Sequence, residues 1–528
     1  MLTWILTILF IFITLLIGVW GMFRTKTLGD YFIGGRSLSS WMSAFAYGIT
    51  YFSAVMFIGF AGKFGWTFGI HALWIALGNT LIGALLAWYV LGYRTRQMTQ
   101  NLDVMTMPEF FEARYQAPYL KIFAAMIIFI FLLPYSASVF QGLGYLFEVT
   151  FGINYTLAIL IMCVVTGIYL ILGGFFAVAL NDFIQGMIMI VGTILMVSIL
   201  VGKTGGLTYT VQAIQTNFAQ DMPTNINWLM LASIVFMTSF GVWGLPQMVQ
   251  KFYAIKDVKQ IGRAAIITTV VSFVIVFPAY FIGGMTHVFY QPPTVVLAER
   301  TMATMTDPAL RAEISAEKKE MWNHGAENIQ RAHAPANLKD GKTMLDFDKF
   351  VPDILHNTLP EALMAVIVLL VLSASMSTLS SLVLVSSSTI AIDLYKGTRH
   401  FDKDSENPLF LIRFLSGLFI LISFFIAMYK FDVIVTLMSL SWGAVSGAFM
   451  APYLLGLYWK GVTRAGVTAG MITGLSTNVI LFFVWGPAYA PMAASAAMLV
   501  PFLVIPAVSL ITKRPDEDVL ERAFRRDG

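Results

Sequence analysis

Long apolar runs constrain this chain more than any other feature. Several runs reach 18 residues or more, and a helix of about 20 apolar residues crosses the ~30 Å hydrocarbon core of a bilayer. Only 12% of the 528 residues are charged, whereas a soluble domain carries about 25%. Because so few charges cannot cover a water-soluble globule of this length, we expect an all-α membrane protein.

The hydropathy pattern predicts 13 transmembrane helices. Their approximate limits are residues 2–22, 40–61, 67–92, 120–148, 155–172, 177–201, 228–250, 263–288, 357–392, 410–429, 432–457, 465–485 and 490–512. Basic residues, Lys251 among them, gather in the loops of one side and in the tail, twenty against three on the other side when the one long loop between the eighth and ninth spans is left out. The positive-inside rule therefore predicts a cytoplasmic C-terminus and an external N-terminus. We expect the first span to be uncleaved, because basic residues follow it rather than precede it.

The predicted spans define one large domain. We expect a transmembrane domain over residues 1–512, an external loop over 289–356 between the eighth and ninth spans, and a cytoplasmic tail over 513–528. The loop mixes charges of both signs with helix-forming residues, which predicts a surface helix near Asp307–Glu320. It is either a solvated cap or a lid over a solute path.

Two spans carry helix-breaking residues near their centres. The second contains Gly48 and Ser53, and the seventh contains Gly241, Gly244 and Pro246. Either break alone would be typical of an ordinary kinked membrane helix. Because the two lie five spans apart, the pattern favours two inverted five-helix repeats, helices 2–6 and 7–11, with solute and ion sites near the midplane.

Oxygen-bearing side chains lie inside two other spans. Asp182 is near the cytoplasmic end of the sixth span, and acidic residues inside spans are rare and usually functional. In the ninth span Ser377, Ser380 and Ser381 share one helical face with Ala374. The serines would suit helix packing, and Asp182 alone could serve as a cap or an ion-pair partner. Taken together with the breaks, these oxygens favour a hard monovalent cation.

Enzyme motifs are absent from the sequence. Lys203 follows Gly202, but Val197 stands where a phosphate-binding loop would need its first glycine. The chain has no G-x-S-x-G or HExxH motif, and Cys163 is its one cysteine. We therefore expect neither an enzyme nor an ATP-driven pump.

Several motifs resemble the sodium/solute symporter family, which includes bacterial proline, pantothenate, sugar and sialic acid carriers. The similarity covers about residues 1–512 and implies a leucine-transporter-like fold with alternating access. The motifs are Asp30–Ser37 (DYFIGGRS), Met107–Phe111 (MPEFF), Gly173–Val178 (GGFFAV), Met376–Ser381 (MSTLSS), Asp393–Tyr395 (DLY) and Thr463–Gly466 (TRAG).

The resemblance also implies two sodium sites. The main site would take the backbone carbonyls of Ile49, Phe52 and Ala374 and the hydroxyls of Ser377 and Thr378. Some members hold a further sodium nearer the cytoplasm, and its positions match Asp182, Ser377, Ser380 and Ser381. Sodium is thus the expected coupling ion, with two ions per cycle.

The solute positions depart from known members. Proline carriers have an acidic residue where Tyr51 stands and a tyrosine where Val242 stands, and sialic acid carriers use an arginine in the fourth span, where this chain has none. The polar and aromatic residues expected around the midplane are Tyr47, Tyr51, Ser53, Trp74, Trp243, Gln247 and Trp442. They suit a small neutral or zwitterionic organic solute.

We therefore expect sodium-coupled symport of such a solute across the plasma (inner) membrane by a monomer embedded in the lipid bilayer, with no nucleic acid partner. A transporter-like solute sensor or a channel is the alternative.

Overall fold

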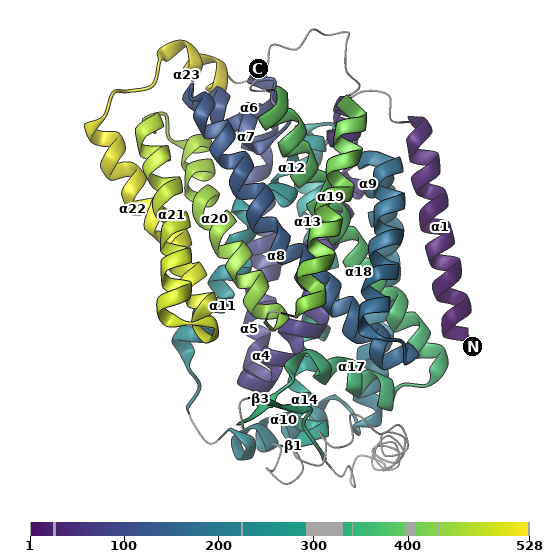
Figure 1. Ribbon diagram of the computed structural model, residues 1–528. Helices are drawn as coiled ribbons and strands as arrows, with labels where there is room; N and C mark the ends of the chain where they lie inside the picture. The colour runs from purple at the N-terminus through teal and green to yellow at the C-terminus, as the bar shows by residue number, and fades with distance from the viewer. Residues whose placement is uncertain are drawn as a thin grey trace.

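The computed structural model is a single bundle of helices with two short strand pairs at one end (Figure 1). It describes residues 2–24, 28–222, 225–291, 331–339, 342–396, 408–430 and 432–525. The N-terminal end of α1 and the last described helix, α23, lie at opposite ends of the bundle (Figure 1). The surface helix expected near Asp307–Glu320 lies outside the described residues.

The α-helices are α1 (Leu2–Arg24), α2 (Leu28–Ile33), α3 (Ser40–Tyr51), α4 (Ala61–Phe68), α5 (Leu73–Gly78), α6 (Tyr93–Asn101), α7 (Met107–Tyr115), α8 (Pro118–Phe151), α9 (Tyr155–Lys203), α10 (Leu207–Asp221), α11 (Trp228–Phe240), α12 (Pro246–Ala254), α13 (Ile261–Gly284), α14 (Thr286–Phe289), α17 (Phe347–Thr358), α18 (Glu361–Ser388), α19 (Pro408–Tyr429), α20 (Ile434–Tyr458), α21 (Arg464–Trp485), α22 (Ala490–Ile511) and α23 (Glu517–Phe524). β1 (Tyr290–Gln291) pairs in parallel with β2 (Ala332–His333), and β3 (Ala336–Lys339) pairs antiparallel with β4 (Lys342–Leu345).

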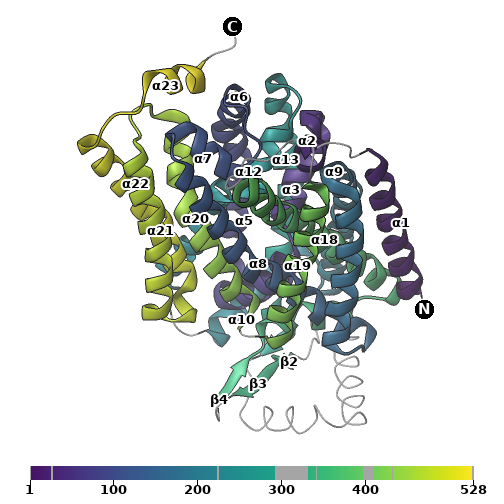
Figure 2. The same cartoon turned by 45° about the horizontal axis from the view of Figure 1, so that its top comes forward.

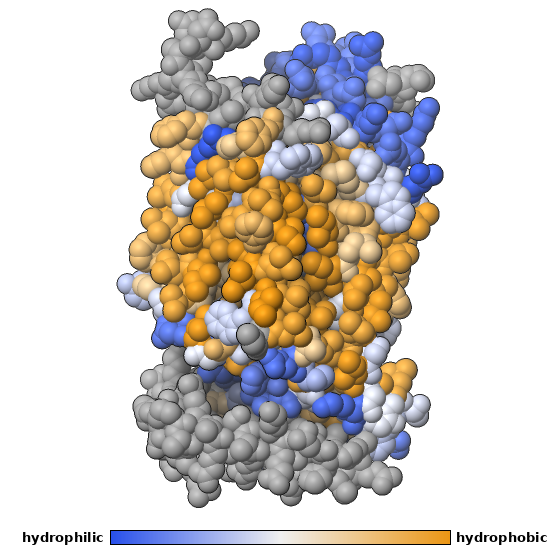
Figure 3. Space-filling model, turned by 90° about the vertical axis from the view of Figure 1, so that its right-hand side faces the viewer, coloured by the Kyte–Doolittle hydropathy of each residue, from blue (hydrophilic) through white to orange (hydrophobic). Residues whose placement is uncertain are grey.

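An apolar belt crosses the face of the bundle seen in Figure 3, between two polar ends. Among the described residues, ten helices are long and apolar enough to cross a membrane, or eleven when the bent pair Trp228–Gly244 and Pro246–Ala254 is counted as one span. The belt explains the large exposed apolar side chains, because lipid rather than water would cover them. The predicted class, an all-α membrane protein, is confirmed, and the number thirteen stays a prediction.

Two of these helical stretches are longer than one crossing needs. Tyr155–Lys203 has 49 residues and Val55–Asn101 has 47, so each would extend about 70 Å if it were straight. Each contains a glycine in a conformation that L-residues avoid: Gly174 has φ 62° and ψ −171°, and Gly69 has φ 54° and ψ −130°. Gly174 falls between the predicted spans 155–172 and 177–201, so this helix bends where the sequence predicts a boundary, whereas Gly69 lies two residues inside the predicted span 67–92.

The bundle has inner and outer helices. In their most apolar windows, 94% of α20 and 83% of α18 are buried, against 28% of α1 and α21. Figure 2 shows α1 and α22 at opposite edges of the bundle. The serine-rich α18 is therefore an inner helix, which places its hydroxyl groups inside the protein.

Both predicted helix breaks are confirmed. Helix α3 ends at Tyr51, and Phe52 has extended dihedral angles of −114° and 109° before helical structure resumes at Val55. Helix α11 ends at Phe240, a 3₁₀ turn covers Gly241–Gly244, and α12 starts at Pro246 after a 48° bend.

Candidate functional site

The broken end of α3 lies against the middle of α18. The Thr378 hydroxyl of α18 is within hydrogen-bonding distance of two carbonyls, that of Thr50 at 3.1 Å and that of Ala374 at 3.1 Å. The backbone N–H of Phe52 donates to the Ile49 carbonyl at 3.2 Å. The structure thus brings together the helix segments that carry all five residues expected at the main sodium site. The C-terminal end of a helix also favours a cation, because its unpaired carbonyls point outward.

One hydroxyl at this junction has no partner. The Ser377 side chain is completely buried, and its Oγ makes no hydrogen bond among the described residues. A buried hydroxyl without a partner is costly, so a site that leaves one free fits a bound ion. The residues present therefore fit a sodium ion held by carbonyl and hydroxyl oxygens.

Two of the four residues expected at the second sodium site contact a lysine. Lys251 of α12 places its Nζ 3.5 Å from Asp182 Oδ2 on α9 and donates to Ser381 Oγ on α18 at 3.0 Å. Ser380 donates to the Ser377 carbonyl of its own helix at 2.9 Å. Asp182 and Ser381 are thus joined through the ammonium group of Lys251, a residue that the sequence analysis did not place at this site.

The predicted location of Lys251 is wrong. The sequence analysis counted it as a loop residue just after a span that ended at residue 250. In the structure α12 continues to Ala254, and Lys251 is completely buried. The sequence contained a signal for this burial. Lys251 follows Gln247 by four positions, and residues four apart lie on the same face of a helix, here the inward face.

Hydrogen bonds join the two groups of oxygens. The hydroxyls of Ser381 and Thr50 lie 3.1 Å apart, and the Thr50 carbonyl accepts from Thr378. A continuous path of polar contacts therefore runs from Lys251 through Ser381 and Thr50 to Thr378. Three helices, α12, α18 and α3, are tied together along it.

Trp442 of α20 lies beside both breaks and contacts aromatic side chains of two other segments. Tyr51 at the first break and Trp442 of α20 are stacked with ring centroids 6.4 Å apart, and Tyr135 of α8 meets Trp442 edge-on at 5.9 Å. At the second break, a Cβ on Gly241 would come within 3.1 Å of the Trp442 ring. The sequence analysis missed Tyr135, because nothing in the local pattern of α8 sets it apart from packing aromatics.

The other residues expected around the solute divide into two groups. Tyr47 donates to the Gly83 carbonyl at 2.8 Å, Ser53 accepts from the Val55 N–H at 3.2 Å, and the Trp243 indole donates to the Ile82 carbonyl at 3.2 Å. The buried Gln247 Oε1 and Trp442 Nε1 have no partner among the described residues. Trp74 does not join them, since it lies on α5 with 53% of its surface exposed.

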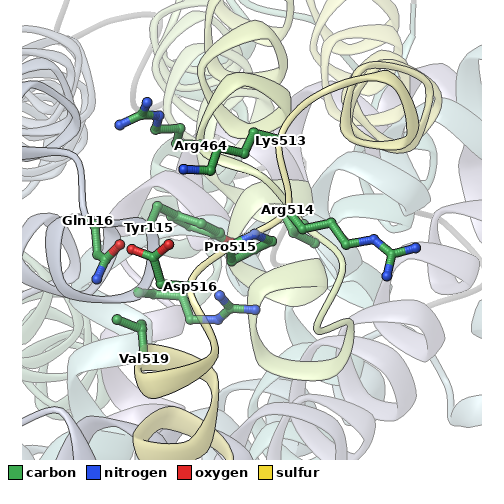
Figure 4. Close-up of a pocket in the computed structure, with 10 residues that line it drawn as sticks. Tyr115, Gln116, Arg464, Lys513, Arg514, Pro515, Asp516 and Val519 are labelled. Atoms are coloured by element: carbon green, nitrogen blue, oxygen red, sulfur yellow. The ribbon is translucent and has the colours of Figure 1, made fainter.

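A small pocket lies next to the second break. It is lined by Pro246, Gln250 and Tyr253 of α12 and by Ser388 of α18, with further residues from the segment that leads into α7. A larger pocket is found near α23, where Arg464, Lys513 and Asp516 are among its lining residues (Figure 4). Neither of these two pockets is lined by a predicted site residue.

Comparisons of the sequence with known proteins find transporters along nearly the whole chain. The sodium/proline symporter 2 of Staphylococcus saprophyticus is 29% identical over 97% of this chain and 93% of its own length. The osmoregulated proline transporter OpuE of Bacillus subtilis is 30% identical over 97% and 96%.

Among solved structures, a Na⁺-coupled sialic acid symporter in a substrate-bound, outward-open state superposes with a TM-score of 0.72 at 17% identity, covering 98% of both chains. Mhp1, a nucleobase-cation-symport-1 family transporter, superposes with a TM-score of 0.53 at 12% identity, covering 94% of this chain and 99% of its own. These two likenesses show the shared fold.

The model of the sodium:solute symporter family matches residues 31–317 and 341–474. Sodium is the coupling ion that membership in this family implies, and its members are transporters rather than enzymes. The chain belongs to the sodium:solute symporter family.

Proposed function

We propose that this protein carries a small neutral or zwitterionic organic solute into the cell together with sodium, which binds between the broken end of α3 and α18. One observation carries the proposal: Ser377 has a buried hydroxyl without a partner, next to the Thr378 hydroxyl that bridges to the Thr50 carbonyl. Sodium there would be held by the carbonyls of Ile49, Phe52 and Ala374 and by the two hydroxyls.

Sodium and solute act on the same pair of helices in this proposal. External sodium binds first and holds α3 against α18, and the adjoining Tyr51 then has its place beside Trp442. The solute closes the outer path, and the helices around the site rock to open it inward. The small pocket between Pro246 and Ser388 supports an exit along α12. Release of sodium then loosens the contact between α3 and α18, and the solute leaves.

The proposed solute class is supported by polar groups without partners and by aromatic faces near the two breaks. The Trp442 indole N–H and the Gln247 carbonyl oxygen are buried without partners, so a donor and an acceptor are free for a solute. The aromatic faces of Tyr51, Tyr135 and Trp442 suit an apolar or cationic part of it. L-Proline, named in the relatives, is the first solute to test, although Tyr51 and Val242 differ from the residues of proline carriers.

The sodium count depends on Lys251. The two ions expected from the sequence would require the second to share Asp182 and Ser381 with the ammonium group of Lys251, which contacts both. We also propose that thirteen spans cross the membrane, with the N-terminus outside, the C-terminus in the cytoplasm and each monomer complete in itself.

Uptake by reconstituted protein tests the proposal. Proteoliposomes that contain the purified protein are given radiolabelled L-proline and a panel of neutral and zwitterionic solutes, with and without an inward sodium gradient. We expect accumulation of at least one solute above its external concentration only when the gradient is present. Downhill entry that ignores sodium would instead indicate a channel, and sodium-dependent binding without uptake would indicate a sensor.

A further inference from the structure

A buried ammonium group lies where the second sodium ion is expected. The Lys251 side chain is 1% exposed, and its Nζ contacts Asp182 Oδ2 at 3.5 Å and Ser381 Oγ at 3.0 Å. The same Nζ is 5.1 Å from the centre of the Phe175 ring, a cation–π distance. A lysine ammonium has three donors, and these three neighbours surround it with two oxygens and an aromatic face.

The charges at this position balance without a second ion. Among the described residues, Lys251 is the one ion-pair partner of Asp182. One carboxylate and one ammonium leave no net charge inside the protein, whereas an added sodium would leave a buried positive charge uncompensated. Such a charge is expensive in a low-dielectric interior, and it would also repel the ammonium a few ångströms away.

The ammonium also does what a bound ion would do for the helices. It connects α12 with α9 through Asp182 and with α18 through Ser381. Because the Ser381 hydroxyl is 3.1 Å from that of Thr50, the same network reaches the end of α3, where the main sodium is proposed to bind. A second sodium ion would have to bind again in every transport cycle, whereas the ammonium group of Lys251 is covalently attached and always present.

We propose that the Lys251 ammonium permanently fills the second sodium site, so that the protein couples one sodium ion, at the main site, to each solute. This inference rests on the proposed function, since it presupposes that sodium binds between α3 and α18. At 100 mV and a tenfold sodium gradient, one ion supports roughly 500-fold accumulation of a neutral solute, and two would support roughly 10⁵-fold.

Sodium binding measured without any solute tests this inference. Radiolabelled sodium is titrated onto the purified full-length protein, and both the number of ions bound and the Hill coefficient are determined. We expect one ion and a Hill coefficient of one. Lys251→Gly removes the ammonium and leaves space beside Asp182, so that variant should bind two ions.

Lys256→Gly is the control, because it removes an equal charge from an exposed position five residues away. It should bind one ion, as the unchanged protein does. Two ions bound by the unchanged protein would overturn the inference even if Lys251→Gly could not be purified. A folded Lys251→Gly that still binds a single ion would also overturn it. Failure of the unchanged protein to bind any sodium would instead contradict the main site and with it the proposed function.

Discussion

The Thr378 hydroxyl, in the middle of α18, is 3.1 Å from the backbone carbonyl of Thr50 in the last turn of α3. The contact joins positions 328 residues apart in the chain and lies next to the free hydroxyl of Ser377. A broken helix therefore ends on a helix that offers hydroxyl groups, and an ion between them would hold both in place.

Removal of the Thr378 hydroxyl should weaken sodium coupling. Thr378→Ala deletes one proposed ligand and one hydrogen bond, and hydrogen bonds to charged groups contribute about 1.5–3 kcal/mol. The sodium concentration for half-maximal uptake should therefore rise about tenfold or more. Ser375→Ala is the control, because the Ser375 hydroxyl only donates to the Val371 carbonyl of its own helix. Equal effects of the two substitutions would contradict the main site.

The indole N–H of Trp442 should act on the solute rather than on sodium. Trp442→Phe keeps an aromatic face beside Tyr51 and removes a buried donor that has no protein partner among the described residues. We expect half-saturation by the solute to rise about fivefold to tenfold while sodium binding stays constant. Trp74→Phe, on the exposed surface of α5, should change neither value. For each variant, the half-saturating concentrations of solute and of sodium are measured by varying each of them in uptake experiments.

Gly174 should be indispensable to the shape of α9. Its φ of 62° and ψ of −171° belong to a region that is essentially restricted to glycine, so Gly174→Ala should destabilise the protein by about 1–3 kcal/mol. Thermal unfolding in detergent measures the loss. Gly167→Ala in the same helix is the control, since the nearest atom to its Cβ would be Ile420 Cδ1 at 3.8 Å. An equal loss in both variants would argue against strain at Gly174.

Asp348 on α17 should make stability depend on pH. Burial, with a smaller contribution from Asp346, raises the pKa of the Asp348 carboxyl from 3.8 to about 7, and its Oδ2 accepts from the Ile434 N–H at 3.2 Å. Because the folded-state pKa is the higher one, the stability from this group is complete below about pH 4 and is lost as the pH rises to about 7. The whole change is at most about 4 kcal/mol.

Asp348→Asn removes this titration and keeps a side-chain oxygen for the Ile434 N–H. Its melting temperature should exceed that of the unchanged protein by more at about pH 8 than at about pH 5. The control is Asp518→Asn, an exposed position on α23, which should follow the unchanged protein at both pH values. Parallel pH profiles for all three proteins would refute a titrating Asp348.

The local sequence predicted the parts of the fold that local chemistry decides. Apolar runs predicted a helical membrane protein, and Pro246 with its neighbouring glycines predicted the second break, because proline removes a backbone donor within the helix. The break after Tyr51 followed from Gly48 and Ser53. Membership in the family, which the motifs suggested, is confirmed by the match over residues 31–317 and 341–474.

What the sequence by itself determined is which residue types are available: apolar spans, two breakable helices, serine hydroxyls on α18 and a carboxylate at Asp182. The tertiary structure decided which of them meet. It turned Trp74 outward, brought Tyr135 to Trp442, and placed Lys251 against Asp182, 69 positions away in the chain. In a hydropathy analysis, a lysine marks the end of a span. A buried charge needs partners, and these are not contained in the local sequence. Only the packing of α12 against α9 and α18 supplies the carboxylate and the hydroxyl that make the burial of Lys251 possible.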